Sequence, residues 1–272
     1  MVNGYMVTTL QEALEIRSRE AVIPYCGGTD LMIEPEEDAS FLFLGKIPEL
    51  KNIVDDGQYI RIGAACTFTE VLEHELSPAI LKEAVSQIAA PAIRNLGTVG
   101  GNICNGSPKG DSALICVATD ANLRLASKNS ERIIPITEFF LGRKKTALRA
   151  DELLVEILMS RTGLDHYYFK KVGARDALAI SRVAFAGVFD VVDEKITTCI
   201  TAFGAVSDIF IRRPEIDAML SGKTIEEAKA IKEQYLAAYD EAIVPIRGRI
   251  SAEYRKTVCM NLLRDFLESN GI

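Results

Sequence analysis

Two glycine-rich segments hold the residue types and spacings that could do chemistry. The first reads C-G-G-T-D-L (residues 26–31) and follows a short apolar run. Two consecutive glycines allow positive φ angles and leave successive backbone N–H groups uncovered by side chains. A concave run of such amides binds phosphate oxygens without a lysine, and the Thr29 hydroxyl would add a donor. The alternative is an ordinary connecting turn, because Gly-Gly pairs are common in turns.

The second segment reads N-L-G-T-V-G-G-N-I-C-N-G (residues 95–106) and has glycine at positions 97, 100 and 101. We expect residues 97–110 to form a loop that presents further backbone donors together with polar Thr and Asn side chains. An irregular glycine loop of this length inside a compact domain is usually functional or disordered. The apolar flanks and low charge argue against disorder, which leaves a functional loop and a purely structural connection as the two interpretations.

Neither segment fits a familiar nucleotide-binding fingerprint. The G-x-x-x-x-G-K-S/T pattern of a P-loop and the G-x-G-x-x-G pattern of a Rossmann site are both absent from them. Two separate glycine segments instead suit a ligand whose diphosphate lies in its middle and is held from both sides. FAD is such a ligand. No nucleophile–base arrangement of side chains accompanies the segments, so no catalytic side chain is predicted.

Local patterns predict the elements that must position these segments. Residues 9–19 form an expected helix, because Thr9 and Glu12 have the spacing of a capping box. The apolar run 21–26 predicts a buried strand that leads into the first segment. Between the two segments we expect a strand at residues 59–64, a helical stretch up to Glu75, and a helix at 81–88 that Pro91 ends or kinks.

The second half of the chain changes character. Residues 122–127 and 132–136 predict a hairpin, and residues 152–159 predict a buried strand. A polar break follows, and we place a domain boundary near 162–168. Beyond it we expect a strand pair at 183–192 and 196–206, then helices at 224–239, with Thr224 and Glu227 as a capping box, and at 252–268. Strands and helices in this order predict the α+β class.

Composition excludes several classes of protein. The 272 residues are 48% hydrophobic and 25% charged, with a net charge of −7, and no basic run resembles a nucleic-acid or membrane footprint. No apolar stretch is long enough for a membrane span. The six cysteines form no C-x-x-C pair, so no metal site is predicted and most should be small buried residues. We therefore expect a cytoplasmic protein in a reducing compartment.

The glycine segments become recognisable with their flanks. P-Y-C-G-G-T-D-L (residues 24–31) and I-R-N-L-G-T-V-G-G-N-I-C-N-G (residues 93–106) together resemble the paired FAD motifs of the molybdenum hydroxylase flavoprotein family. We call these ranges the first and second glycine motifs. G-G-N-I-C-N-G in particular is similar to bacterial xanthine dehydrogenase flavoprotein subunits. The resemblance continues, in the expected order, at residues 61–71, 151–154, 169–181 and 202–206.

This resemblance implies a fold. Residues 1–165 would form an FAD-binding domain of the vanillyl-alcohol-oxidase or PCMH type, with subdomains at about 1–55 and 56–165. Residues 166–272 would form an α+β domain of the CO dehydrogenase flavoprotein type.

The resemblance also implies which residues contact FAD. Asp111 would accept hydrogen bonds from the adenosine ribose, and Leu154 and Lys170 would lie near the flavin ring. Because Lys171 is adjacent, the choice between the two lysines stays open. The implied FAD-binding residues are Pro24, Tyr25, Cys26, Gly27, Gly28, Thr29, Asp30, Leu31, Gly97, Thr98, Val99, Gly100, Gly101, Asn102, Asp111, Leu154 and Lys170.

The resemblance implies, finally, an FAD-binding electron-transfer subunit of a xanthine dehydrogenase-like molybdenum hydroxylase. Its partners would be a small 2Fe–2S subunit and a large molybdopterin subunit, and NAD(H) would be the electron acceptor. An FAD subunit of a nicotinate or CO dehydrogenase type and a stand-alone flavoprotein oxidoreductase remain alternatives. A non-redox scaffold is disfavoured, because both glycine motifs are intact. The substrate is not encoded here, because its pocket would lie on the large subunit.

Overall fold

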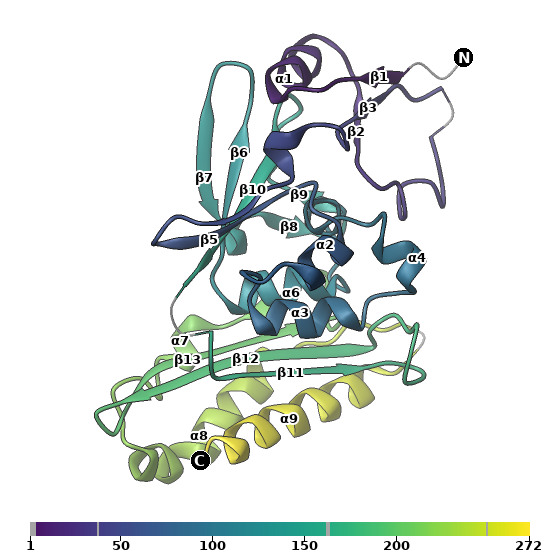
Figure 1. Ribbon diagram of the computed structural model, residues 1–272. Coiled ribbons are helices and arrows are strands. Elements are labelled where there is room, and N and C mark those ends of the chain that lie inside the picture. The colour runs from purple at the N-terminus through teal and green to yellow at the C-terminus, as the bar shows by residue number, and fades with distance from the viewer. Residues whose placement is uncertain (1–3, 37, 162–163, 249) are drawn as a thin grey trace. The chain divides into compact units, whose positions relative to one another are not determined.

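The computed structural model describes residues 4–36, 38–161, 164–248 and 250–272 (Figure 1). It separates into two compact units that alternate along the sequence. Unit 1 comprises Met1–Pro78, Ile88–Gly106 and Asp120–Arg161, and unit 2 comprises Ala79–Gln87, Ser107–Thr119 and Thr162–Ile272. The predicted contiguous domains and subdomains stay predictions. Residues 162 and 163, where the predicted break begins, lie outside the described residues.

A small parallel sheet in unit 1 carries the start of the first glycine motif. Its strands β1 (Gly4–Met6), β2 (Ile23–Tyr25) and β3 (Phe41–Phe43) have the order β1-β3-β2. The strand predicted at 21–26 is confirmed as β2, but it is half-buried rather than buried, because it lies at an edge of the sheet.

Helix α1 (Leu10–Arg19) connects the first two strands and begins at the predicted cap. The Thr9 side chain accepts a hydrogen bond from the Glu12 N–H at 3.2 Å. The Glu12 carboxylate, however, accepts from the N–H of Thr8 rather than from that of Thr9. Ala13 and Leu14 are buried in a core that includes Leu42 of β3.

A second sheet of unit 1 is antiparallel. Its order is β4-β5-β10-β6-β7, with β4 (Ile53–Asp55), β5 (Tyr59–Gly63), β6 (Asn122–Ala126), β7 (Glu131–Pro135) and β10 (Leu153–Ser160). The predicted strands at 59–64 and 152–159 and the predicted hairpin are confirmed. β10 occupies the centre of the sheet, and its burial explains its mainly apolar sequence; the one charged residue in it, Glu156, pairs with Arg61 and Arg124 of the neighbouring strands. Shorter elements of unit 1 are η1 (Pro48–Leu50), α2 (Phe68–Glu73), α4 (Pro91–Arg94), α5 (Val99–Cys104), η2 (Ile136–Glu138), β8 (Phe140–Gly142) and β9 (Lys145–Thr146).

Two local predictions for this region were wrong. Pro91 does not end the preceding helix, which stops at Ser86; it starts α4, where a residue without an N–H is tolerated. The stretch predicted as loop from 97 to 110 contains α5. Thr98 caps this helix by accepting a hydrogen bond from the Gly101 N–H, and this cap together with tertiary packing outweighs the low helix propensity of glycine.

Unit 2 is built on an antiparallel sheet of order β11-β12-β13-β14. The strands are β11 (Tyr167–Val172), β12 (Val183–Val192), β13 (Lys195–Gly204) and β14 (Ile211–Arg212). The predicted strand pair is confirmed as β12 and β13. Asp193 and Glu194 join them with φ angles of 50° and 64°, as a tight turn between right-twisted strands requires.

Helices cover both faces of this sheet. Figure 1 shows α8 (Ile225–Ala242) and α9 (Ala252–Ser269) on one face and α3 (Ala79–Ser86) and α6 (Asp111–Ala118) on the other, while the short α7 (Pro214–Asp217) follows β14. Both predicted C-terminal helices are confirmed, and so is the Thr224–Glu227 capping box. The α+β class is confirmed as well.

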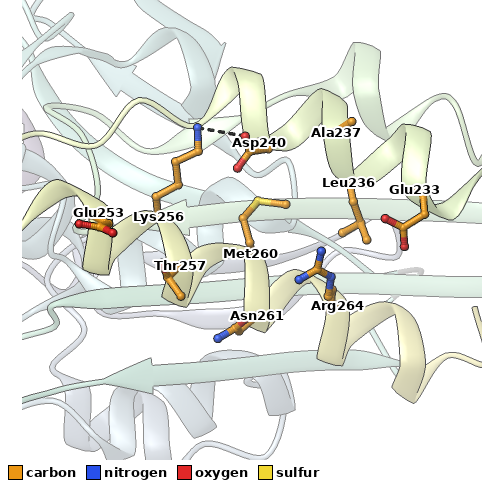
Figure 2. A pocket seen from close by; sticks show the side chains of 10 residues that line it. All are labelled: Glu233, Leu236, Ala237, Asp240, Glu253, Lys256, Thr257, Met260, Asn261 and Arg264. Carbon is orange, nitrogen blue, oxygen red and sulfur yellow. Dashed lines mark ion pairs between the residues drawn. The ribbon is translucent and has the colours of Figure 1, made fainter.

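The outer surface of α8 and α9 carries a groove of about 530 Å³. In it, Lys256 pairs with Asp240 at 3.3 Å (Figure 2). Acidic, basic and apolar side chains all line the groove. Among the described residues, no helix has the length and apolar character needed to cross a membrane.

Candidate cofactor site

The first glycine motif turns sharply after β2. Gly28 has a φ of +66°, as the sequence predicted for this Gly-Gly pair. A Cβ at Gly28 would lie 2.2 Å from the hydroxyl oxygen of Tyr25, so the position accepts only glycine on both conformational and steric grounds. The Tyr25 ring is itself fixed by packing against Phe41 and Phe43, with ring centroids 5.7 and 5.0 Å away.

The turn contains a run of backbone N–H groups for which the described residues supply no acceptor. The N–H groups of residues 27–31 donate to no acceptor among the residues that the structure describes, and the next N–H, that of Met32, donates to the Gly28 carbonyl at 2.9 Å. Backbone N–H groups seldom stay without a partner, which can be protein, water or a ligand. Successive amides around a positive φ form a nest that binds anions. This segment can therefore hold a phosphate group.

The second glycine motif packs directly against the first. A Cβ at Gly27 would lie 1.8 Å from the carbonyl oxygen of Leu96, so the two backbones approach as closely as only glycine permits. The Asn105 side-chain amide also donates a hydrogen bond to the Asp30 carboxylate. The structure thus brings together the two motifs that the sequence identified.

Several backbone N–H groups of the second motif, which were expected to be available to a ligand, have acceptors within the protein. The N–H groups of Val99 and Gly100 donate to carbonyls of Cys66 and Ala64, at 3.1 and 3.0 Å. Those of Gly101 and Asn102 donate to the side chain and carbonyl of Thr98, both at 3.0 Å. For these four amides, the prediction that the segment presents further backbone donors was wrong, because capping and tertiary contacts already occupy them.

What the second motif does present is an exposed surface at Gly101. A Cβ there would meet only the Thr98 hydroxyl oxygen, at 2.8 Å. At the neighbouring Gly100, by contrast, a Cβ would lie 2.5 Å from the Ala64 carbonyl oxygen, and at Gly97 it would contact Phe68. Close packing therefore accounts for the glycines at 97 and 100. Gly101 is exposed, and its missing side chain leaves the backbone accessible.

Each glycine motif also contains one cysteine. Cys26 and Cys104 are half-buried and free. Burial raises the pKa of the Cys26 thiol, although a hydrogen bond with Thr98 acts in the opposite direction. Burial likewise raises the pKa of Cys104 to about 12. Both thiols are therefore neutral at physiological pH and add no negative charge beside the phosphate-binding amides. Four of the six cysteines are buried, as predicted for most of them.

Three other residues of unit 1 that were predicted to contact FAD lie within strands or helices. Pro24 lies in β2, and Val99 is completely buried in the first turn of α5. Leu154 is 5% exposed in β10, opposite Leu125 and next to a β-bulge. Packing accounts for Val99 and Leu154 in the structure, and their predicted contacts with the flavin stay predictions.

The predicted residues of unit 2 form a separate group. Asp111 is the first residue of α6 and is buried. Its carboxylate accepts hydrogen bonds from the Lys171 ammonium at 2.7 Å and from the Ser181 hydroxyl at 2.6 Å. Burial raises the pKa of Asp111, and the nearby Lys171 and Ser181 act against that rise. Lys170 is exposed, with its Nζ 5.8 Å from the centroid of the Tyr168 ring.

Ser181 was not predicted as a site residue, and Lys171 was named only as the alternative to Lys170 near the flavin. Both lie within the segment 169–181, whose resemblance to the family was the only available signal. Alternating side chains on β11 place the two adjacent lysines on opposite faces of the strand. Lys171 is the one joined to Asp111, and the choice of the lysine that lies near the flavin stays a prediction.

Comparisons with known proteins identify chains that are similar to this one. Residues 1–159 match the FAD binding domain in molybdopterin dehydrogenase, and residues 167–270 match the CO dehydrogenase flavoprotein C-terminal domain. The chain is 33% identical over 225 residues to the xanthine dehydrogenase FAD-binding subunit of Escherichia coli O157:H7, covering 77% of this chain and 76% of the relative. It is 35% identical over 187 residues to the nicotinate dehydrogenase FAD-subunit of Eubacterium barkeri, covering 64% of this chain and 63% of that relative.

Solved structures share the fold. A chain of reconstituted CO dehydrogenase from Oligotropha carboxidovorans superposes with a TM-score of 0.89 at 23% identity, covering 98% of this chain and 96% of the other.

Proposed function

The chain belongs to the family of FAD-binding subunits of molybdopterin dehydrogenases, and from this premise we propose that it is the electron-transfer subunit of a xanthine dehydrogenase-like molybdenum hydroxylase. The cofactor is FAD. The xanthine-type assignment is supported by the 33% identity over most of the chain and by the wording of the second glycine motif. The runner-up is a nicotinate-type hydroxylase, which the 35% identity over a shorter range favours.

One observation carries the assignment of the cofactor site. The consecutive uncommitted amides of residues 27–31 fit a diphosphate, which brings two negative charges and several acceptor oxygens. Their geometry depends on Gly28, where no other residue fits, and Gly101 of the adjoining motif is exposed and carries no side chain. The residues present therefore fit the central part of FAD.

The protein's own contribution is to bind, orient and adjust the cofactor. When bound, FAD supplies two-electron redox chemistry, which no side chain here could provide. We propose that Asp111 accepts the ribose hydroxyls of the adenosine, since an ionised acceptor makes the stronger hydrogen bonds. Leu154 would provide apolar packing for the flavin ring. A cation at Lys170 would favour the anionic reduced flavin and raise its potential.

We propose partners on the same basis. Electrons would arrive from 2Fe–2S clusters in a small subunit, after hydroxylation at a molybdopterin cofactor in a large subunit, and would leave to NAD⁺. The names of the relatives, which are FAD subunits and medium chains, support a role inside such a complex. We also propose the domain division 1–165 and 166–272, which the ranges of the two family models support.

A flavin titration tests the core of this proposal. The purified chain reconstituted with FAD should show the visible absorption of bound flavin, and NADH should bleach it under anaerobic conditions. A protein that stays colourless would refute the site. Bound flavin that NADH leaves oxidised would refute the acceptor alone.

The intact complex tests the remaining part. Xanthine should bleach the flavin in the complex but not in the isolated chain. Bleaching of the isolated chain by xanthine would favour a stand-alone oxidoreductase, and bleaching of the complex by nicotinate alone would favour the runner-up.

A further inference from the structure

Unit 2 contains a buried ion pair whose partners come from different elements. The Lys171 Nζ of β11 lies 2.7 Å from an Oδ of Asp111 at the start of α6, and the two side chains are only 8% and 5% exposed. Lys171 also donates to the Gln87 carbonyl at 2.9 Å, and Ser181 donates to the second Asp111 oxygen at 2.6 Å. Both charged groups are thus fixed by several hydrogen bonds.

This arrangement leaves the carboxylate with spare acceptor capacity. An ionised carboxylate has about four lone-pair positions, and the two donors from Lys171 and Ser181 occupy one on each oxygen. Burying an ion pair often costs more in lost hydration than the attraction between the two charges returns, so stability alone does not account for this pair. Within the part of the chain that the structure describes, no other side chain donates to this carboxylate, so one acceptor position remains on each oxygen, and two such positions match the two adjacent hydroxyls of a ribose.

We propose that Lys171 is a positioning residue for FAD, which holds the Asp111 carboxylate in place as the acceptor for the hydroxyls of the adenosine ribose. This inference rests on the proposed function, since it assumes that Asp111 meets the ribose. Lys170 cannot substitute, because its side chain is exposed and lies over Tyr168. Lys171 also lines a cavity of about 410 Å³ formed with residues 172–176, and Lys171→Arg retains the positive charge at this position.

The test compares FAD with its analogue that carries 2′-deoxyadenosine. Affinities of the full-length protein for both are measured by quenching of flavin fluorescence. One hydrogen bond to a charged acceptor should give the wild type a preference for FAD of about tenfold or more. The preference should fall to about twofold or less in Lys171→Met and should be retained in Lys171→Arg. A purely structural lysine would weaken binding of both ligands equally and leave the preference unchanged.

Two further variants keep the result interpretable. Ser181→Ala removes one donor to Asp111 but retains the ion pair, so it tests the same orientation if Lys171→Met does not fold, and it should lower the preference several-fold. Lys229→Met breaks the surface pair of Lys229 with Glu226, 2.8 Å apart on α8, and should leave the preference intact.

The possible outcomes distinguish the proposed function from the inference about Lys171. A wild-type protein that binds neither ligand overturns the proposed function. A wild type that binds both ligands equally overturns the inference alone, as does an unchanged preference in Lys171→Met or, where that variant does not fold, in Ser181→Ala.

Discussion

The substitution Gly101→Val separates cofactor binding from folding. Gly101 lies in the first turn of α5 and is exposed, and a Cβ there meets only the Thr98 hydroxyl oxygen, at 2.8 Å. Disturbing this N-cap costs about 1 kcal/mol, and replacing glycine within a helix returns a few tenths. The free energy of unfolding should therefore change by less than about 1.5 kcal/mol, and the variant should fold.

Binding of FAD should respond far more strongly. The isopropyl group would fill the space that the diphosphate requires beside the first glycine motif, and we expect binding to be lost. Even partial accommodation would cost about 1–3 kcal/mol of overpacking, which corresponds to roughly a 5- to 150-fold loss of affinity.

The assay is the ratio of flavin to protein absorbance after reconstitution and gel filtration, with a thermal melt to verify folding. Gly45→Val is the matched control, because Gly45 is exposed and a Cβ there meets nothing within 4 Å. Gly100→Ala is the opposite case: its Cβ would lie 2.5 Å from the Ala64 carbonyl, so it should destabilise the fold. A folded Gly101→Val protein with normal flavin content would show that the second motif does not face the cofactor.

Two further predictions concern stability. Asp217→Ala should lower the free energy of unfolding by about 3–5 kcal/mol, because it removes the buried carboxylate that pairs with Arg212 and accepts hydrogen bonds from Thr201, Tyr235 and Tyr239. Tyr235→Phe removes one 2.8 Å hydrogen bond to Asp217 and should cost about 1 kcal/mol. Equal losses in chemical denaturation would contradict this. Burial acts to raise the pKa of Glu152, but hydrogen bonds from Arg132 and from the Arg149 N–H outweigh it and hold that pKa below its ordinary value of 4.5. A depressed acid pKa contributes stability above the unfolded value that is lost as the pH falls through the folded value, so Glu152→Gln should destabilise more at about pH 7 than at about pH 3. The same loss at both pH values would show that the carboxylate charge is unimportant.

The sequence by itself determined those features that depend on near neighbours. Thr224 and Glu227 predicted a helix start, because a capping box is completed within four residues. The Gly27–Gly28 pair predicted a turn with positive φ, because residues that carry a Cβ rarely adopt that conformation. The mainly apolar sequence of β10 and the local sequences of β6 and β7 likewise predicted these strands. Motif wording identified the family, but it did so through resemblance rather than through physical derivation.

Tertiary structure alone decided the roles within the second glycine motif. Its glycines predicted a loop, yet Thr98 and contacts with Ala64 made it a helix whose first amides have acceptors inside the protein. Ala64 is more than thirty residues away in the chain, so no local pattern could reveal that contact.

The same holds for the two adjacent lysines. Only the pairing of β11 in its sheet places Lys171, rather than Lys170, against Asp111 sixty residues earlier. The sequence determined which residue types are available at the cofactor site. The fold determined which backbone amides stay uncommitted and which lysine is joined to the buried carboxylate, because both depend on partners distant in sequence.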